Sequence, residues 1–284
     1  MKVFWTTVVT FVRALFGALA DFRRQGCFSL SASMAYFALL SFFPMIFLLL
    51  YGLSFFMGAD RLGHEFLLTF FQGFMPGLGA ELAEEVKRVA SEQVVQWVVL
   101  AVFSWFGMLV FYEVDYAVNV VFGSARTRNA LISTLMSVVL LIFVGLLMTA
   151  SYVITQIMNV IVSYAPRIAG IDSVALAAHG FLLAYVLPFA SILFAVTWIY
   201  RYLPQNRPTW RQAISGGLVF TLLWEVAKHL FSTYVQNLTV YGRMYGSLLV
   251  VVLFLLWVYY SAVLFLYSAA VVRRLQLVQV ISPK

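Results

Sequence analysis

Residues 244–272 read MYGSLLVVVLFLLWVYYSAVLFLYSAAVV and contain no Asp, Glu, Lys or Arg. A hydrocarbon core about 30 Å thick needs roughly 20 helical residues to cross it, at about 1.5 Å per residue. This run is therefore long and apolar enough for a membrane-spanning helix. Four more uncharged runs occur, at 25–59, 93–112, 129–166 and 173–200. A further apolar segment at about 212–236 carries a few charges, and with it we expect six spans.

The composition indicates the same class of protein. The chain has 284 residues, of which 63% are hydrophobic and 10% charged, and its mean hydropathy is +0.96. A soluble domain of this length does not stay in solution with such proportions. The net charge of +7 is scattered between apolar runs rather than gathered in one patch, so nucleic acid is not an expected partner. We expect an all-α membrane protein with one integral membrane domain over residues 1–284.

The positive charges predict the orientation. Loops expected on one side hold twelve Lys and Arg residues and those on the other side hold five, which places both termini in the cytoplasm. Residues 1–24 have apolar side chains at helical spacing beside Lys2 and Arg13, which favours an amphipathic helix on the membrane surface. Residues 58–92, approximately, form the largest expected extracytoplasmic loop, with two short helices.

Segment 212–236 places charge at the depth where lipid is expected. A charged side chain at the centre of a membrane helix costs roughly 2.5–3.5 kcal/mol on insertion scales, so such groups face a partner, a cavity or a pathway. Here Glu225, Lys228 and His229 fall within about one turn. At about 100° per residue they share a polar stripe with three more residues, namely Thr221, Ser232 and Gln236. We interpret this stripe as binding substrate or responding to protons.

A second span carries a matching polar face, formed by Tyr152, Gln156 and Asn159 in its outer half. Two polar faces at one depth predict an outward-facing cavity between spans three and five. On the cytoplasmic side of the charged cluster the stripe continues as Leu218 and Ile214. This continuation predicts that apolar packing closes the cavity on that side. The alternative is structural: Glu225 and Lys228 pair within their helix, and the amides form interhelical hydrogen bonds worth about 0.6 kcal/mol each.

Other residues receive structural roles. Pro44 and Pro188 lie inside expected spans, where membrane helices tolerate a bend. The outer turn between spans five and six contains Tyr241, Tyr245 and Gly246. At the inner end of span two, Glu113 and Asp115 are expected to pair with Arg126 and Arg128 at the surface, near Asn119.

Catalytic and metal motifs are missing from the sequence. The three histidines are far apart, there is one cysteine, and no glycine-rich phosphate loop occurs. We therefore expect no cofactor, no metal and no enzyme activity. A metal site assembled from His179, His229 and Glu225 remains an alternative, as does a membrane-embedded enzyme.

Five segments carry a family resemblance: LSASMAYFALLSFFPMIFLL (30–49), GFMPGLG (73–79), DYAVN (115–119), YRYLPQNRPTWRQAISGGLVFTLLWEVAKHLFSTYV (200–235) and YGSLLVVVLFLLWVYYSAV (245–263). In this order they resemble the YihY/virulence factor BrkB family of bacterial inner-membrane proteins. The resemblance implies six membrane helices and a bacterial cytoplasmic (inner) membrane location. Where span six of many members ends in Gly-Ala-Glu, this chain has Ser268, Ala269 and Ala270, so no role of that glutamate carries over.

The resemblance also bears on function. Members were formerly labelled ribonuclease BN-like, but this sequence has no cluster of metal-binding carboxylates on a soluble face, so ribonuclease activity is not expected. Other members are linked to the movement of lipid precursors. We expect a transporter or translocator with membrane lipids as partners and a lipid or amphiphilic substrate. The alternative is a non-transporting membrane scaffold that recruits envelope partners.

Overall fold

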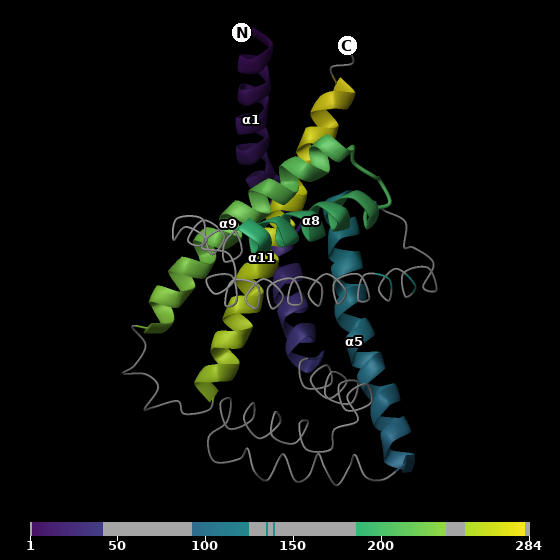
Figure 1. The fold of residues 1–284 in the computed structure, drawn as a ribbon. Coiled ribbons are helices and arrows are strands. Elements are labelled where there is room, and N and C mark those ends of the chain that lie inside the picture. Colours follow the sequence, from purple (N-terminus) through teal and green to yellow (C-terminus); the bar gives the residue numbers. More distant parts are fainter. Residues whose placement is uncertain are drawn as a thin grey trace, which may run out of the picture. The chain divides into compact units, whose positions relative to one another are not determined.

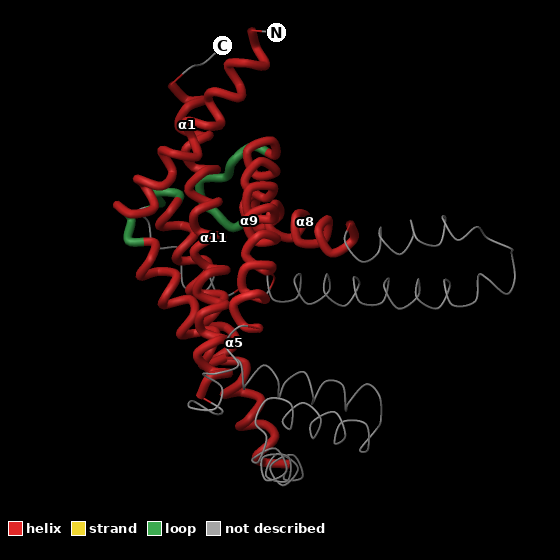
Figure 2. The backbone as a smooth tube through the Cα atoms, turned by 90° about the vertical axis from the view of Figure 1, so that its left-hand side faces the viewer, coloured by secondary structure: helices red, strands yellow, loops and turns green. Residues whose placement is uncertain are grey.

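The computed structural model describes residues 2–41, 93–124, 135, 139, 186–236 and 248–281. All regular structure in these residues is helical, joined by loops (Figure 1, Figure 2). The helices are α1 (Lys2–Arg24), an apolar helix Cys27–Ser41, α5 (Gln93–Val121), α8 (Leu187–Tyr202), α9 (Trp210–Gln236) and α11 (Leu248–Ile281). The predicted all-helical class is confirmed for this part of the chain.

Two of the described helices are long and apolar enough to cross a membrane. They are Trp210–Val235 in α9 and Val251–Val278 in α11. At about 1.5 Å per residue they extend about 39 and 42 Å, which exceeds a hydrocarbon core of about 30 Å. The predicted span 129–166 and the predicted outer loop 58–92 lie outside the described residues, apart from two positions in the span.

The chain forms two compact units. The first comprises Met1–Cys27, Asp115–Val226 and Leu264–Lys284, and the second comprises Phe28–Val114 and Ala227–Val263. Helices α5, α9 and α11 each contribute residues to both units, and each unit is described by itself.

Helices α8, α9 and α11 of the first unit approach each other at two glycines. A Cβ atom on Gly216 would lie 2.1 Å from Cγ2 of Val272 in α11, and 3.2 Å from Cδ2 of Tyr200 in α8. A Cβ atom on Gly217 would lie 2.3 Å from Oγ1 of Thr197 in α8. Small residues allow this kind of close backbone approach between membrane helices. The pair Gly216–Gly217 therefore fixes how α9 packs on both neighbours.

An aromatic core surrounds this contact. The Tyr200 ring is fully buried, and its hydroxyl donates a hydrogen bond of 2.7 Å to the carbonyl of Phe265. The Tyr200 and Phe265 rings lie 5.1 Å apart, and Phe220 of α9 meets Phe265 edge-on at 6.0 Å. A buried phenol needs a hydrogen-bond partner, which the Phe265 carbonyl supplies.

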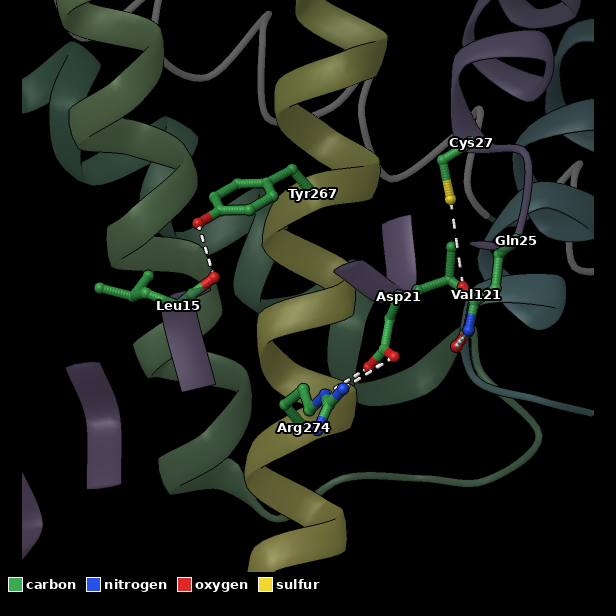
Figure 3. Close-up of polar contacts among 7 residues, drawn as sticks. All are labelled: Leu15, Asp21, Gln25, Cys27, Val121, Tyr267 and Arg274. Atoms are coloured by element: carbon green, nitrogen blue, oxygen red, sulfur yellow. Dashed lines mark hydrogen bonds and ion pairs between the residues drawn. The ribbon is translucent and has the colours of Figure 1, made fainter. Parts of the chain in front are cut away.

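Helix α1 packs on α11 through one face. Its buried residues recur every fourth position, as Ala14, Ala18 and Phe22. The Tyr267 hydroxyl of α11 donates to the Leu15 carbonyl at 3.1 Å, and the Phe22 and Tyr267 rings meet edge-on at 6.4 Å. Figure 3 shows that bond and, further along α11, the Arg274 guanidinium facing Asp21. Two guanidinium nitrogens bond the two oxygens of Asp21, with Nη2 to Oδ1 at 2.9 Å.

Helix α5 ends in a turn that requires glycine. Gly123 has φ +68°, its N–H donates to the Val120 carbonyl, and Ser124 N–H donates to the Asn119 carbonyl, both at 3.0 Å. This pair of bonds is the Schellman arrangement, which satisfies carbonyls at a helix end. The Arg273 guanidinium of α11 lies beside Gly123, where a cation is favourable because of the helix dipole.

Candidate functional site

The charged stripe lies on a helix that is continuous through it. Glu225 and Lys228 are half-buried and His229 is exposed. Each of the three makes at least one polar or ring contact. At about 1.5 Å per residue, Glu225 lies about 4 Å along the axis from the midpoint of Trp210–Val235, and His229 about 10 Å from it. If α9 crosses a membrane, all three side chains begin inside the hydrocarbon layer.

The other predicted stripe residues have different environments. Thr221 is fully buried, and its hydroxyl donates to the Gly217 carbonyl at 2.8 Å within the same helix. Ser232 is exposed, and Gln236 is the last residue of α9. The ionisable side chains of the stripe are thus those at positions 225–229. Thr221 is buried and bonds to its own helix.

The predicted apolar closure of the cavity involves span three, which lies outside the described residues apart from two positions, and it stays a prediction. Ile214 and Leu218 are 43% and 39% exposed.

Several predicted residues lie outside the described part of the chain. They are Pro44, Tyr152, Gln156, Asn159, Tyr241, Tyr245 and Gly246. Pro188 falls in the first turn of α8, after the N-cap residue Val186. At such a position the missing N–H removes no bond within the described helix.

A second polar cluster, which we call the α5 junction, comprises Asp115, Asn119, Gln205, Asn206 and Gln276. Asp115 and Asn119 are buried, and Asn119 Nδ2 donates to Asp115 Oδ1 at 3.0 Å and to the Asp115 carbonyl at 2.8 Å. Asn119 Oδ1 accepts a bond of 3.0 Å from the N–H of Gln205, 86 residues away. The side chain of Asn119 thus joins α5 to the turn between α8 and α9.

The same turn is joined to α11 and to the end of α5. Gln276 Nε2 donates to the Asn206 carbonyl at 3.1 Å, and Asn206 Nδ2 lies 3.5 Å from the carbonyl of Phe122. Gln25, which follows α1, donates to the Val121 carbonyl at 3.4 Å (Figure 3). Side-chain amides therefore connect α1, α5, α11 and the turn between α8 and α9 in the first unit.

The surface network predicted for the carboxylates of α5 is wrong for Asp115. That residue is only 3% exposed and bonds to Asn119. Glu113, in the second unit, accepts a bond from the Ser33 hydroxyl. The predicted partners Arg126 and Arg128 lie outside the described residues.

Sequence reasoning did not single out Gln25, Gln205, Asn206 or Gln276. A signal was present for two of them, because LPQNRP at 203–208 places two amides between two prolines in a short polar turn. Nothing in the local sequence shows that the turn contacts α5 and α11.

Comparison with known proteins decides the family. A family model described as Virulence factor BrkB matches residues 18–282. The chain belongs to this family. The predicted resemblance is thereby confirmed, and the matched region contains both the charged stripe of α9 and the α5 junction.

Curated relatives of this BrkB-family chain are named membrane proteins. It is 29% identical to a UPF0761 membrane protein of Alkalilimnicola ehrlichii over 257 residues, which cover 87% of this chain and 55% of the relative. The corresponding protein of Azotobacter vinelandii is 28% identical over 246 residues, or 86% and 59% of the two chains. A Coxiella burnetii relative is 24% identical over 256 residues, or 88% of each chain.

The chain therefore spans just over half the length of the first two relatives. No solved structure matches it. The names of the relatives and the apolar helices α9 and α11 agree on a membrane protein.

Proposed function

We propose that this BrkB-family chain crosses the bacterial cytoplasmic membrane six times, with both termini in the cytoplasm, and moves a lipid or other amphiphilic envelope precursor across it. In this proposal a polar cavity between α9 and the span at 129–166 opens toward the outside, and the loop at about 58–92 is extracytoplasmic. One observation carries the proposal. Helix α9 continues unbroken through a charged cluster near the middle of its membrane-length segment.

The two sides of α9 support a pathway on the charged side. Leu222, Val226 and Leu230 are exposed apolar residues, and Leu230 is 67% exposed. At about 100° per residue they lie 60°, 100° and 140° around the helix from Glu225, whereas Lys228 lies at −60° and His229, at +40°, borders that apolar face. Lipid tails suit the apolar face. The charged side needs water, protein or a headgroup, because an isolated charge in hydrocarbon is costly.

The chemistry of the cluster fits an amphiphilic substrate. The Lys228 ammonium can attract a headgroup phosphate, and the Glu225 carboxylate can accept or release a proton as the headgroup passes. His229 adds a third side chain able to carry a proton. Neutralising the headgroup charge during passage lowers the free-energy cost of crossing the hydrocarbon layer.

The surface position proposed for α1 has support from its exposed residues. Val12, Phe16 and Leu19 lie within about 60° of each other around the helix, and Phe16 is 76% exposed. This apolar face is distinct from the face that packs on α11. An interfacial helix places such a face in the lipid.

A translocation assay tests the proposal. The purified protein is reconstituted in vesicles that contain fluorescently labelled phosphatidylglycerol or phosphatidylethanolamine, and dithionite quenching measures how fast the label crosses. We expect Glu225→Gln and Lys228→Met to slow crossing at least about tenfold, which corresponds to about 1.4 kcal/mol in the barrier. Leu222→Ala, on the apolar face, is the matched control and should stay within about twofold of the wild-type rate.

Two results would count against translocation. One is wild-type protein that moves neither lipid faster than protein-free vesicles do. The other is well-folded Glu225→Gln and Lys228→Met variants with wild-type rates. The exposed face of α1 favours a membrane scaffold as the second candidate, and the first result, combined with partner binding that depends on Phe16, would support it.

A further inference from the structure

Three arginines lie at the turn between α8 and α9. Arg201 is in the last turn of α8, Arg207 is in the loop, and Arg211 is in the first turn of α9. Arg207 and Arg211 are exposed. Within the described residues, no carboxylate pairs with any of the three. The turn thus carries positive charge that the described chain does not neutralise.

Arg201 lies beside a pair of aromatic rings. Its guanidinium carbon lies 5.7 Å from the ring centre of Tyr202 and 5.8 Å from that of Trp210, and the two rings meet edge-on at 5.9 Å. Such cation–π contacts do not use the hydrogen-bonding capacity of the N–H groups. Arg201 Nε is buried and has no hydrogen-bond partner among the described residues. Because Nε is enclosed by protein, an acceptor supplied from outside the described chain would have to meet the Nη groups of Arg201.

The backbone that carries the arginines is fixed by its surroundings. Pro204 and Pro208 are fully buried, and the α5 junction holds the intervening residues. Gln212 Oε1 accepts a bond of 2.8 Å from the N–H of Thr209, which is half of a capping box at the start of α9. A fixed turn loses little conformational entropy when a ligand binds, which favours affinity.

The position of the turn indicates the kind of ligand. Trp210 is the first residue of the membrane-length segment Trp210–Val235 and is 47% exposed. Trp and Tyr gather at the level of lipid headgroups, where phosphodiesters are the abundant acceptors. The fork of an arginine matches phosphate oxygens in pairs. Basic groups at the ends of membrane helices attract anionic headgroups.

We propose that the α8–α9 turn binds the phosphodiester headgroup of an anionic phospholipid, with Arg201 as the central ligand and Arg207 and Arg211 as supporting charges. This site is at the end of α9, whereas Glu225 lies near the middle of that helix. The inference goes beyond the proposed translocation, because a bound lipid here needs no transport.

Native mass spectrometry of the full chain tests the site. The detergent-solubilised protein is titrated with dioleoyl phosphatidylglycerol or dioleoyl phosphatidylcholine, and retained lipid is counted. We expect the wild type to prefer phosphatidylglycerol and Arg201→Gln to weaken its binding about tenfold, because one charge-assisted pair is lost. Arg24→Gln, which removes an exposed arginine outside the turn, should change binding less than twofold. Arg201→Lys keeps the charge but not the forked guanidinium, so its affinity for phosphatidylglycerol should lie between those of the wild type and Arg201→Gln.

Competition with inorganic phosphate separates a lipid site from a site for free phosphate. Retention of phosphatidylglycerol in millimolar phosphate supports the lipid, and displacement by phosphate overturns the assignment. Equal retention of the two lipids by the wild type, or unchanged binding in folded Arg201→Gln, also overturns it. The comparison of the two lipids uses the wild type alone, so the test stands even where a variant does not fold.

Discussion

Gly216→Ala is expected to lower the melting temperature of the purified protein by about 5 °C or more. The new methyl group would meet Cγ2 of Val272 at 2.1 Å. Val272 is fully buried, and its branched side chain has few alternative rotamers, so α9 and α11 must move apart. Overpacking typically costs about 1–3 kcal/mol and occasionally more. A clash this short belongs at the upper end and exceeds the gain of about 1 kcal/mol from replacing glycine within a helix.

Gly17→Ala is the matched control for this substitution. A Cβ atom there would lie 3.2 Å from the guanidinium carbon of Arg274, a contact that a small shift of that side chain relieves. Its melting temperature should change little. Adding Val272→Ala to Gly216→Ala should restore much of the loss, because it removes the clashing methyl. An unchanged or raised melting temperature in Gly216→Ala would show that the two helices do not approach as described.

Asn119→Asp is expected to destabilise the protein by about 3–5 kcal/mol, the range for an uncompensated buried charge. Asn119 Nδ2 now donates to Asp115 Oδ1 at 3.0 Å. Aspartate would replace that donor with a carboxylate oxygen, so two carboxylates would meet in a buried site. The bond from Gln205 N–H can still form, which means that the loss reports mainly on the pair with Asp115.

Thermal unfolding at several pH values measures this effect. The destabilisation should lessen as the pH falls, because protonation of one of the two facing carboxyls removes the repulsion. Asn206→Asp is the matched control, since Asn206 is exposed and its bond to Phe122 is long at 3.5 Å. Equal melting temperatures for the two variants would argue against a buried Asp115–Asn119 pair.

The sequence was informative where a property is repeated along one helix. The uncharged run at 244–272 predicts α11, because the length and the apolar character of a helix can be read from consecutive residues. The family followed from short segments in a fixed order, and the match over residues 18–282 confirms it.

Contacts between distant segments were not predictable in the same way. A helical projection places Thr221 beside Glu225, but it does not reveal that Thr221 is fully buried or that α8 and α11 approach α9 at Gly216 and Gly217. Asp115 looked like a surface carboxylate, because the local sequence does not show that its partner Asn119 also bonds to Gln205, 86 residues along the chain. The sequence SGGL shows two glycines, and only the structure shows that each meets a different helix.

Accessibility of the middle of α9 to water tests the central claim most directly. Single cysteines replace Lys228 or Leu230 in a Cys27→Ser background, and a membrane-impermeant thiol reagent is added outside intact cells. Lys228 lies about 8 Å from the midpoint of the segment and Leu230 about 11 Å, on sides about 160° apart. A hydrated, outward-facing pathway predicts that Lys228→Cys reacts at least about tenfold faster, although it is deeper. Equally slow reaction of both cysteines, or faster reaction at Leu230→Cys, would contradict it.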